Sequence, residues 1–330
     1  MADEILLAGL GRVGASLALA LRNPKIQVRL AGYDPEKRVA REALKAQVVD
    51  RTLNSLREAP PECDLCILSL DPEAMIPALE TLSDVLPEGA LILGTSPVQS
   101  HILAWVTEHM PPGRRYIGIV PVEGASAIEP AGLYDDIPRA DRFAGGVMAL
   151  VLPPGTPQAS IDVALSLASI AGARPFFMDA SELDAAAAAN NTLPALLAAA
   201  LMATSSRQPG WRDARRLTGA TFAHATALID AQIPGMTPAT LLLQRTSLLD
   251  RLDALQIELS EWRSALASDT EDALKHHLDA ATRSHDAWLA ARRKGDWGVE
   301  EMSPSPPLHG PSALERMFGL SPRRRKPDSD

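Results

Sequence analysis

The chain has 330 residues, of which 46% are hydrophobic and 22% are charged, and its formal net charge is −9 at pH 7. This length and composition are typical of a soluble globular protein of two domains and exclude a disordered or fibrous chain. The acidic balance argues against nucleic acid or an anionic membrane as a partner. The N-terminus, MADEILLAGLG, has acidic residues where a secretory signal has basic ones, so we expect a cytoplasmic protein.

Short apolar runs alternate with helical patterns from residue 4 to about residue 178. These runs predict strands at 5–9, 27–33, 64–70, 90–94, 116–120, 147–152 and 174–178. Strands that alternate with helices form mostly parallel sheets covered by helices. Residues 1–180 are therefore expected to form one α/β domain.

A glycine-rich loop directly follows the first predicted strand, with Gly9, Gly11 and Gly14 in the order G-x-G-x-x-G before a helical pattern. The first glycine allows a tight turn, the second lets a pyrophosphate approach the backbone, and the third lets the helix pack closely on the strand. Asp34 ends the next predicted strand, where a carboxylate binds the ribose hydroxyls of a dinucleotide. The domain is therefore expected to be a Rossmann-type dinucleotide-binding domain. Asp34 favours NAD, and the basic residues just after it keep NADP possible. The predicted cofactor-binding residues are Gly9, Gly11, Arg12, Val13, Gly14 and Asp34.

Beyond residue 181 the sequence is rich in alanine and leucine and shows helical periodicity, without a strand pattern, to about residue 294. Residues 181–298 are expected to form an all-helical substrate and dimerisation domain. Within it, the apolar stretch 185–203 carries Asn190, Asn191 and Pro194, which favour a buried helix over a membrane span. A long buried stripe is predicted for leucines spaced three or four residues apart, and so much apolar surface predicts a homodimer. These leucines are Leu241, Leu242, Leu248, Leu249, Leu252, Leu255 and Leu259.

Two further segments of the sequence predict structural features rather than a functional site. Residues 299–330 are rich in proline and serine and are expected to form a flexible tail, whose basic run 323–326 is a solvated terminus. Cys63 and Cys66 form a C-x-x-C pair without a second pair or a helix start. We interpret both cysteines as packing residues in a reducing compartment and expect no metal site.

Several segments resemble, in the same order, the motifs of one known family. GLGRVGASLALAL is similar to G-L-G-x-I-G-G-S-L-A-x-A-L, and YIGIVPVEG occupies the place of FVGGHPMAG. LDAAAAANNTLPALLAAAL and PGWRDARRLTG resemble the HD…SHLPH and GFRDMTRIA segments. The family is that of the prephenate/arogenate dehydrogenases of tyrosine biosynthesis, and the resemblance covers about residues 4–294. It implies an NAD(P)-dependent oxidoreductase that oxidises and decarboxylates a small carboxylic acid.

The resemblance also implies candidate catalytic residues. Ser96 falls at the family's active-site serine, although Pro97 departs from the family's S-V-K or S-T-K. Arg216 falls on the arginine that pairs with a substrate carboxylate, a role suited to the two-pronged guanidinium. Thr192 lies in the segment that resembles SHLPH and retains a hydroxyl that can bond a ligand.

The chain departs from the family where a proton acceptor is expected. The histidine of the family's H-P pair takes the proton of the substrate hydroxyl during hydride transfer, and this position is Val120 here. Both histidines of SHLPH are also missing, replaced by Thr192 and Ala195. His101, five residues beyond Ser96, is a candidate for a relocated base, but we expect it on a helix that leads away from the site.

Two functions therefore fit the sequence. The first is a dehydrogenase that is slow or acts on another cyclic or hydroxy acid, because an acid–base group contributes only about 10²–10⁴ in rate and orientation can contribute more. The second is a catalytically inactive family member that senses dinucleotide or scaffolds a partner. A dehydrogenase with a lysine acid–base group in the helical domain is disfavoured, since residues 181–260 contain no lysine.

Overall fold

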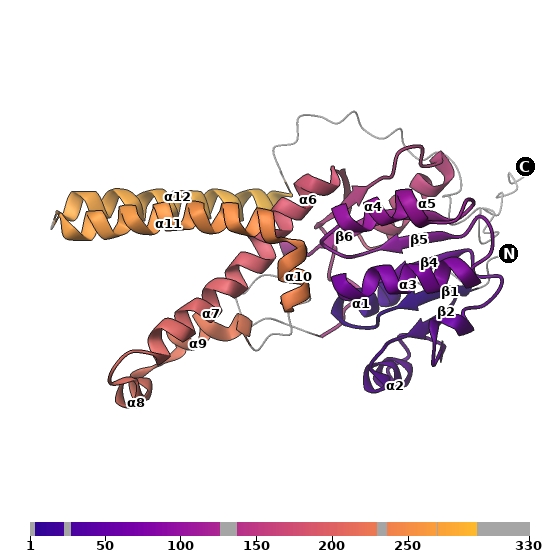
Figure 1. Ribbon diagram of the computed structural model, residues 1–330, viewed down its shortest axis with the longest axis horizontal. Coiled ribbons are helices and arrows are strands. Elements are labelled where there is room, and N and C mark those ends of the chain that lie inside the picture. The colour runs from indigo at the N-terminus through magenta and orange to yellow at the C-terminus, as the bar shows by residue number, and fades with distance from the viewer. Residues whose placement is uncertain (1–3, 23–27, 126–136, 230–235, 269, 296–330) are drawn as a thin grey trace, which may run out of the picture.

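The computed structural model describes residues 4–22, 28–125, 137–229, 236–268 and 270–295 (Figure 1). At its centre is an eight-stranded sheet with the order β3-β2-β1-β4-β5-β6-β7-β8. All neighbouring strands in this sheet are parallel except β6 and β7. The predicted Rossmann-type fold with a mostly parallel sheet is therefore confirmed. The strands are β1 (Glu4–Ala8), β2 (Arg29–Tyr33), β3 (Arg51–Thr52), β4 (Leu65–Leu68), β5 (Leu91–Gly94), β6 (Arg115–Val122), β7 (Val147–Val151) and β8 (Arg174–Phe177).

Each predicted strand is present, and the sheet has one strand more. The additional strand is β3, whose two residues pair with the outer side of β2, Arg51 opposite Ala31 and Thr52 opposite Gly32. A two-residue edge strand has no apolar run of its own, so the hydrophobic pattern does not reveal it.

Helices cover both faces of the sheet. They are α1 (Arg12–Leu21), α2 (Lys37–Lys45), α3 (Pro72–Val85), α4 (Ser100–His109) and α5 (Gln158–Ile170). One core cluster holds buried residues of α1, α2 and α5, and a second holds those of α3 and α4. Cys63 and Cys66 are buried in the second cluster and are not joined by a disulfide. Burial raises the pKa of Cys63 to about 11, so both cysteines act as packing residues.

After β8 the described chain is helical up to residue 295. The helices are α6 (Ala180–Ala187), α7 (Leu193–Ser206), α8 (Trp211–Ala214), α9 (Ala220–Thr226), α10 (Pro238–Leu243), α11 (Arg245–Ala267) and α12 (Glu271–Lys294), and a π-helical turn, Ala188–Thr192, joins α6 to α7. Two arms diverge from the sheet in Figure 1: α7 with α8 and α9, and the hairpin of α11 and α12. Because both arms extend away from the sheet, the rest of the described chain leaves much of their surface exposed (Figure 1).

The predicted burial of the leucine stripe is wrong for a single chain. Only Leu248 of that stripe is buried, while Leu242, Leu249 and Leu259 are 71%, 49% and 57% exposed. The stripe is exposed because α11 packs along α12 and meets the rest of the described chain only near its N-terminal end (Figure 1). The expected burial of 185–203 is also wrong, because α7 extends away from the sheet in the other arm (Figure 1). The helical run Ala180–Ser206 is long and apolar enough to cross a membrane, yet only 28% of its most apolar window is buried.

Candidate active site

The glycine loop between β1 and α1 is tightly packed at two of its three glycines. Gly9 has φ +99°, and a Cβ there would lie 2.0 Å from the Ser69 carbonyl oxygen, so only glycine fits. A Cβ on Gly14 would lie 2.0 Å from the Gly9 carbonyl oxygen. A Cβ on Gly11 would meet no heavy atom within 4 Å of the described chain. The loop is thus closed on the protein side and open at Gly11, as the approach of a pyrophosphate requires.

Asp34 lies directly after β2, beside this loop. Its carboxylate accepts hydrogen bonds from the backbone N–H groups of Leu10 at 2.8 Å and Glu36 at 2.9 Å. The carboxylate is therefore fixed at the carboxyl edge of the sheet, where it can face a ribose. Arg38, one of the basic residues that keep NADP possible, pairs with Glu42 at 3.0 Å on the surface of α2.

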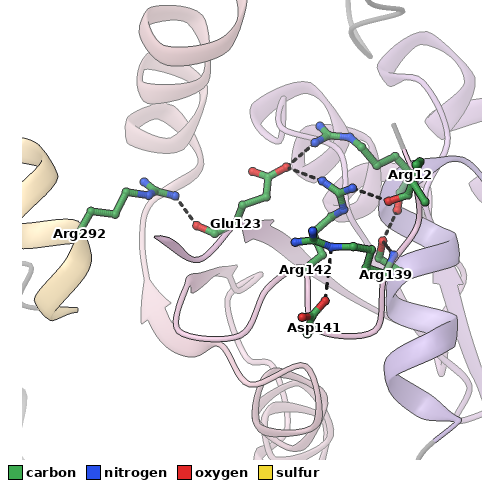
Figure 2. A network of polar contacts seen from close by, with 8 residues as sticks. Arg12, Glu123, Arg139, Asp141, Arg142 and Arg292 are labelled. Carbon is green, nitrogen blue, oxygen red and sulfur yellow. Dashed lines mark hydrogen bonds and ion pairs between the residues drawn. The ribbon is translucent and has the colours of Figure 1, made fainter. Parts of the chain in front are cut away.

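Arg12, the first residue of α1, points toward Glu123 (Figure 2). It forms an ion pair with the Oε1 atom of Glu123, the residue after β6. Arg142 approaches the same oxygen, with its Nη1 atom at 3.8 Å, and Arg292 of α12 donates to the Glu123 backbone carbonyl. Glu123 thereby connects the cofactor loop to a buried arginine and to the last turn of the α11–α12 hairpin.

A second set of contacts fastens the segment after residue 137 onto α1. The Ser16 hydroxyl donates to the Arg12 carbonyl at 2.6 Å and accepts the backbone N–H of Arg139 at 3.1 Å. Arg142 is only 1% exposed, and its Nη2 atom donates to the Ile137 carbonyl at 2.5 Å. The first turn of α1 is therefore held from the side of β6 as well as from the glycine loop.

Ser96 lies just beyond β5 and is almost fully buried. Its hydroxyl donates to the Val98 carbonyl at 3.1 Å and accepts the Val98 N–H at 3.2 Å, which closes a local turn. The buried side chain of Gln99 donates to the Ser96 carbonyl at 2.7 Å and accepts from the Tyr116 hydroxyl at 2.9 Å. Burial raises the pKa of Tyr116, so this phenol stays protonated. These hydrogen bonds thus hold Ser96 in place at the carboxyl edge of the sheet.

Val120 belongs to a small apolar cluster on β6. The cluster comprises Val120, Ala149, Val151 and Leu183, with Leu103 packed against it. Leu183 comes from α6, so the start of the helical region packs directly on the strand position where the resemblance places a histidine. Neither side chain can accept a proton.

Thr192 and Arg216 are not brought to one place within the chain. Thr192 ends the π-helical turn, is 4% exposed, and donates its hydroxyl to the Gln244 side-chain oxygen at 2.7 Å. Arg216 lies in the turn directly after α8, the helix at the far end of the α7–α9 arm in Figure 1. Its side chain is 74% exposed and lies 3.6 Å from Asp213. One chain alone therefore gathers Ser96 and the glycine loop at one edge, without Arg216.

The residues at this edge fit a nicotinamide dinucleotide. The first turn of α1 has no side-chain cap among the described residues, so its N–H groups and helix dipole can stabilise phosphate. Gly11 borders open space, and the Asp34 carboxylate lies beside the loop through its hydrogen bond from the Leu10 N–H. Backbone and side chain together thus give the donor set that this cofactor requires.

Comparisons with known proteins show what the chain is similar to. A sequence model of the prephenate dehydrogenase nucleotide-binding domain matches residues 17–171. The prephenate dehydrogenase of Bacillus subtilis (strain 168) is 24% identical over 299 residues, which make up 89% of this chain and 78% of that protein. The sheet domain therefore resembles the nucleotide-binding domain of the prephenate dehydrogenase family.

Solved structures share the fold of this chain. The crystal structure of prephenate dehydrogenase from Aquifex aeolicus, in complex with hydroxyphenyl propionate and NAD+, has a TM-score of 0.75 and 17% identity, and the match covers 86% of this chain and 98% of that one. Synechocystis arogenate dehydrogenase has a TM-score of 0.64 and 20% identity, with coverage of 86% and 99%. The architecture therefore extends over both the sheet and the helical region.

The sequence reading missed two residues that the structure places at the site. Glu123 stands where the prephenate dehydrogenase motif HPMAG has alanine, and this departure was the available signal. Asp184 stands at the aspartate of the family's HD pair, and its carboxylate accepts the N–H groups of Gln99 and Ser100 at the start of α4. Neither contact can be read from spacing, since Glu123 is 111 residues from Arg12 and Asp184 is 85 from Gln99.

Proposed function

We propose that this chain is a member of the prephenate dehydrogenase family, an NAD-dependent dehydrogenase that oxidises prephenate, arogenate or a closely related cyclic hydroxy acid with loss of carbon dioxide. The observation that carries this proposal is the fit of the glycine loop, open only at Gly11, on a fold that matches the family over most of the chain. Gly9, Gly11, Arg12, Val13, Gly14 and Asp34 hold the cofactor, and the chain acts in the cytoplasm on a small carboxylic acid.

The bound nicotinamide supplies the hydride acceptor, and the protein orients the substrate against it. Ser96 lies at the carboxyl edge, where its hydroxyl can exchange the Val98 carbonyl for the oxygen that is being oxidised. Thr192 supports the helical side of the site through its bond to Gln244. Because aromatisation of the ring is strongly downhill, orientation can sustain turnover without a residue that accepts a proton at position 120.

NAD is the proposed cofactor in preference to NADP. The Asp34 carboxylate, held by Leu10 and Glu36, would repel a 2′-phosphate. Arg38 already pairs with Glu42 and would have to give up this partner in order to bind such a phosphate.

The site is proposed to be completed in a homodimer. Arg216 lies far from Ser96 in its own chain, on an arm whose exposed leucines lack cover among the described residues (Figure 1). A second copy that covers the arms would bury these leucines and bring Arg216 to the carboxylate of a substrate bound by the partner.

The experiment that tests the function measures formation of reduced nicotinamide by the purified protein. Prephenate and arogenate are each supplied with NAD and with NADP, alongside a titration of dinucleotide binding. Turnover with NAD supports the proposal. The apolar Val120 and Leu183 favour the second candidate function, a dinucleotide sensor, and binding without turnover would establish it in place of the dehydrogenase.

A further inference from the structure

His101 lies on the helix that the sequence predicts for it, in the first turn of that helix. It is the second residue of α4, so it lies at the carboxyl edge of the sheet, from which the helix leads away. The first turn of α4 is held there by Asp184, which accepts the N–H groups of Gln99 at 2.5 Å and Ser100 at 3.1 Å. His101 therefore lies where the start of α4 meets α6.

The imidazole of His101 is half-buried beside α3 and α6. α3 contributes the backbone of Pro72, α6 contributes the Asp184 carboxylate, and both interactions favour the protonated ring. Glu73, the next residue of α3, is engaged by the Thr240 hydroxyl of α10 at 2.7 Å. Desolvation by burial outweighs the favourable interactions and lowers the pKa of His101 below its usual value of 6.5, so the ring is neutral at pH 7.

The two ring nitrogens of His101 differ in their surroundings. Nδ1 is buried and makes no hydrogen bond within the described part of the chain. A buried polar atom without a partner calls for an explanation, and a catalytic role is one. A neutral imidazole carries its proton on one ring nitrogen and can accept a second proton on the other.

The other polar groups at the edge are already committed. The Ser96 hydroxyl bonds to Val98, and the Thr192 hydroxyl bonds to Gln244. The Glu123 carboxylate is paired with Arg12 and Arg142. Val120 and Leu183 are apolar. Among the described residues named at this edge, His101 is the one neutral base.

We propose that His101 is the catalytic proton acceptor of this chain, in place of the histidine that Val120 replaces. The inference rests on the proposed dehydrogenase function. In the step, the O–H bond of the substrate hydroxyl breaks and its proton passes to the unprotonated ring nitrogen of His101. The hydrogen on the same carbon leaves with its electron pair to oxidised nicotinamide, and a C=O bond forms. Asp184 then stabilises the imidazolium.

The test compares wild-type protein with His101→Ala and with His109→Gln. His109 lies on the same helix, is 54% exposed and stacks on Trp105, so it is a matched control. With prephenate or arogenate and NAD, we expect kcat of His101→Ala to fall about 10²–10⁴-fold. The rise of wild-type kcat/KM with pH, through a group below pH 6.5, should disappear. NAD affinity should stay within about twofold, and added imidazole should restore part of kcat, which a purely structural role would not allow.

The outcomes of this test distinguish the role of His101 from the proposed dehydrogenase function. Active wild-type protein together with unchanged kcat and pH profile in His101→Ala would overturn the role of His101 and leave the proposed function standing. Inactive wild-type protein would overturn the proposed function and the proton transfer with it. Loss of activity in His101→Ala without rescue and with weakened NAD binding would assign His101 a structural role.

Discussion

The carboxylate of Asp184 accepts the backbone N–H of Gln99 at 2.5 Å and thereby caps a helix of the sheet domain from the first helix of the helical region. Asp184→Ala removes this cap and leaves the first turn of α4 with unsatisfied donors. We expect the free energy of unfolding to fall by about 1–2 kcal/mol. Chemical denaturation measures this loss, and Glu182→Ala, an exposed acidic residue of the same helix, is the control. Equal losses in both variants would contradict the capping role.

A substitution in the glycine loop should weaken NAD binding without affecting folding. Gly11→Ala places a methyl group in open space at φ −66°, so the variant should fold with an unchanged thermal midpoint. The same methyl group stands where the pyrophosphate must approach, and NAD affinity should fall at least about tenfold. Calorimetric titration with NAD measures the change.

Gly14→Ala is the matched control for that experiment. Its methyl group would lie 2.0 Å from the Gly9 carbonyl oxygen, so α1 and the loop must move apart. We expect a loss of stability of about 1–3 kcal/mol as well as weaker NAD binding. If Gly11→Ala binds NAD as wild type does, the dinucleotide does not lie along this loop.

Glu123 is expected to matter for stability because of the arginines around it. Glu123→Gln removes the negative charge that faces Arg12 and the almost fully buried Arg142. Loss of a charged partner from a buried guanidinium should lower the free energy of unfolding by about 1–3 kcal/mol. Glu108→Gln alters a carboxylate that is 77% exposed and should change it by less than about 0.5 kcal/mol. Denaturation midpoints that move together would show that Glu123 is an ordinary surface residue.

The sheet could be predicted from the sequence because its signals are local. Each long strand is a run of apolar residues, and the glycine spacing around Gly11 identifies the turn after β1. Signals of this kind need only neighbouring residues. The edge strand β3 could not be predicted from such local signals because it consists of only Arg51 and Thr52. These residues adopt strand geometry through pairing with β2 rather than through their own preferences.

The contacts that build the site were beyond such reasoning because they join distant segments. In the sequence, Arg12 is one variable position of a glycine motif, and its ion pair with Glu123 forms only in the folded chain. His101 was expected on a helix that leads away from the site, and its distance along the chain from Ser96 does not show that it lies in the first turn of that helix. The structure starts α4 at Ser100 and fixes that start with Asp184.

The edge of the sheet carries a contact that should make stability depend on pH. Arg51 donates from Nε and Nη2 to the two oxygens of Glu4 at 2.8 and 2.6 Å. These hydrogen bonds lower the pKa of Glu4 below its usual 4.5, against the opposing effect of burial. A lowered pKa in the folded state means that the stabilisation is complete above pH 4.5 and is lost as the pH falls through the folded value.

Glu4→Gln tests this dependence. Near neutral pH the variant should be about 1–2 kcal/mol less stable than wild type, and the difference should shrink as the pH falls below 4.5 and through the folded pKa of Glu4. Urea denaturation at a series of pH values measures it. A difference that is constant across the series would show that the Glu4 charge does not contribute, and that the variant acts through packing alone.

The exposed leucines of α11 predict the oligomeric state. Leu259 is 57% exposed on the hairpin, and a glutamate there would place a charge within any surface that covers the stripe. Wild-type protein should sediment with twice the chain mass of 35.2 kDa, and Leu259→Glu should shift the population toward the single chain. Leu44→Glu on α2, where Leu44 is 39% exposed and lies outside the arms, should leave the mass unchanged. Since Arg216 would act across the interface, dissociation should also raise KM for the substrate more than Kd for NAD. A wild-type protein that sediments as one chain would exclude the shared site.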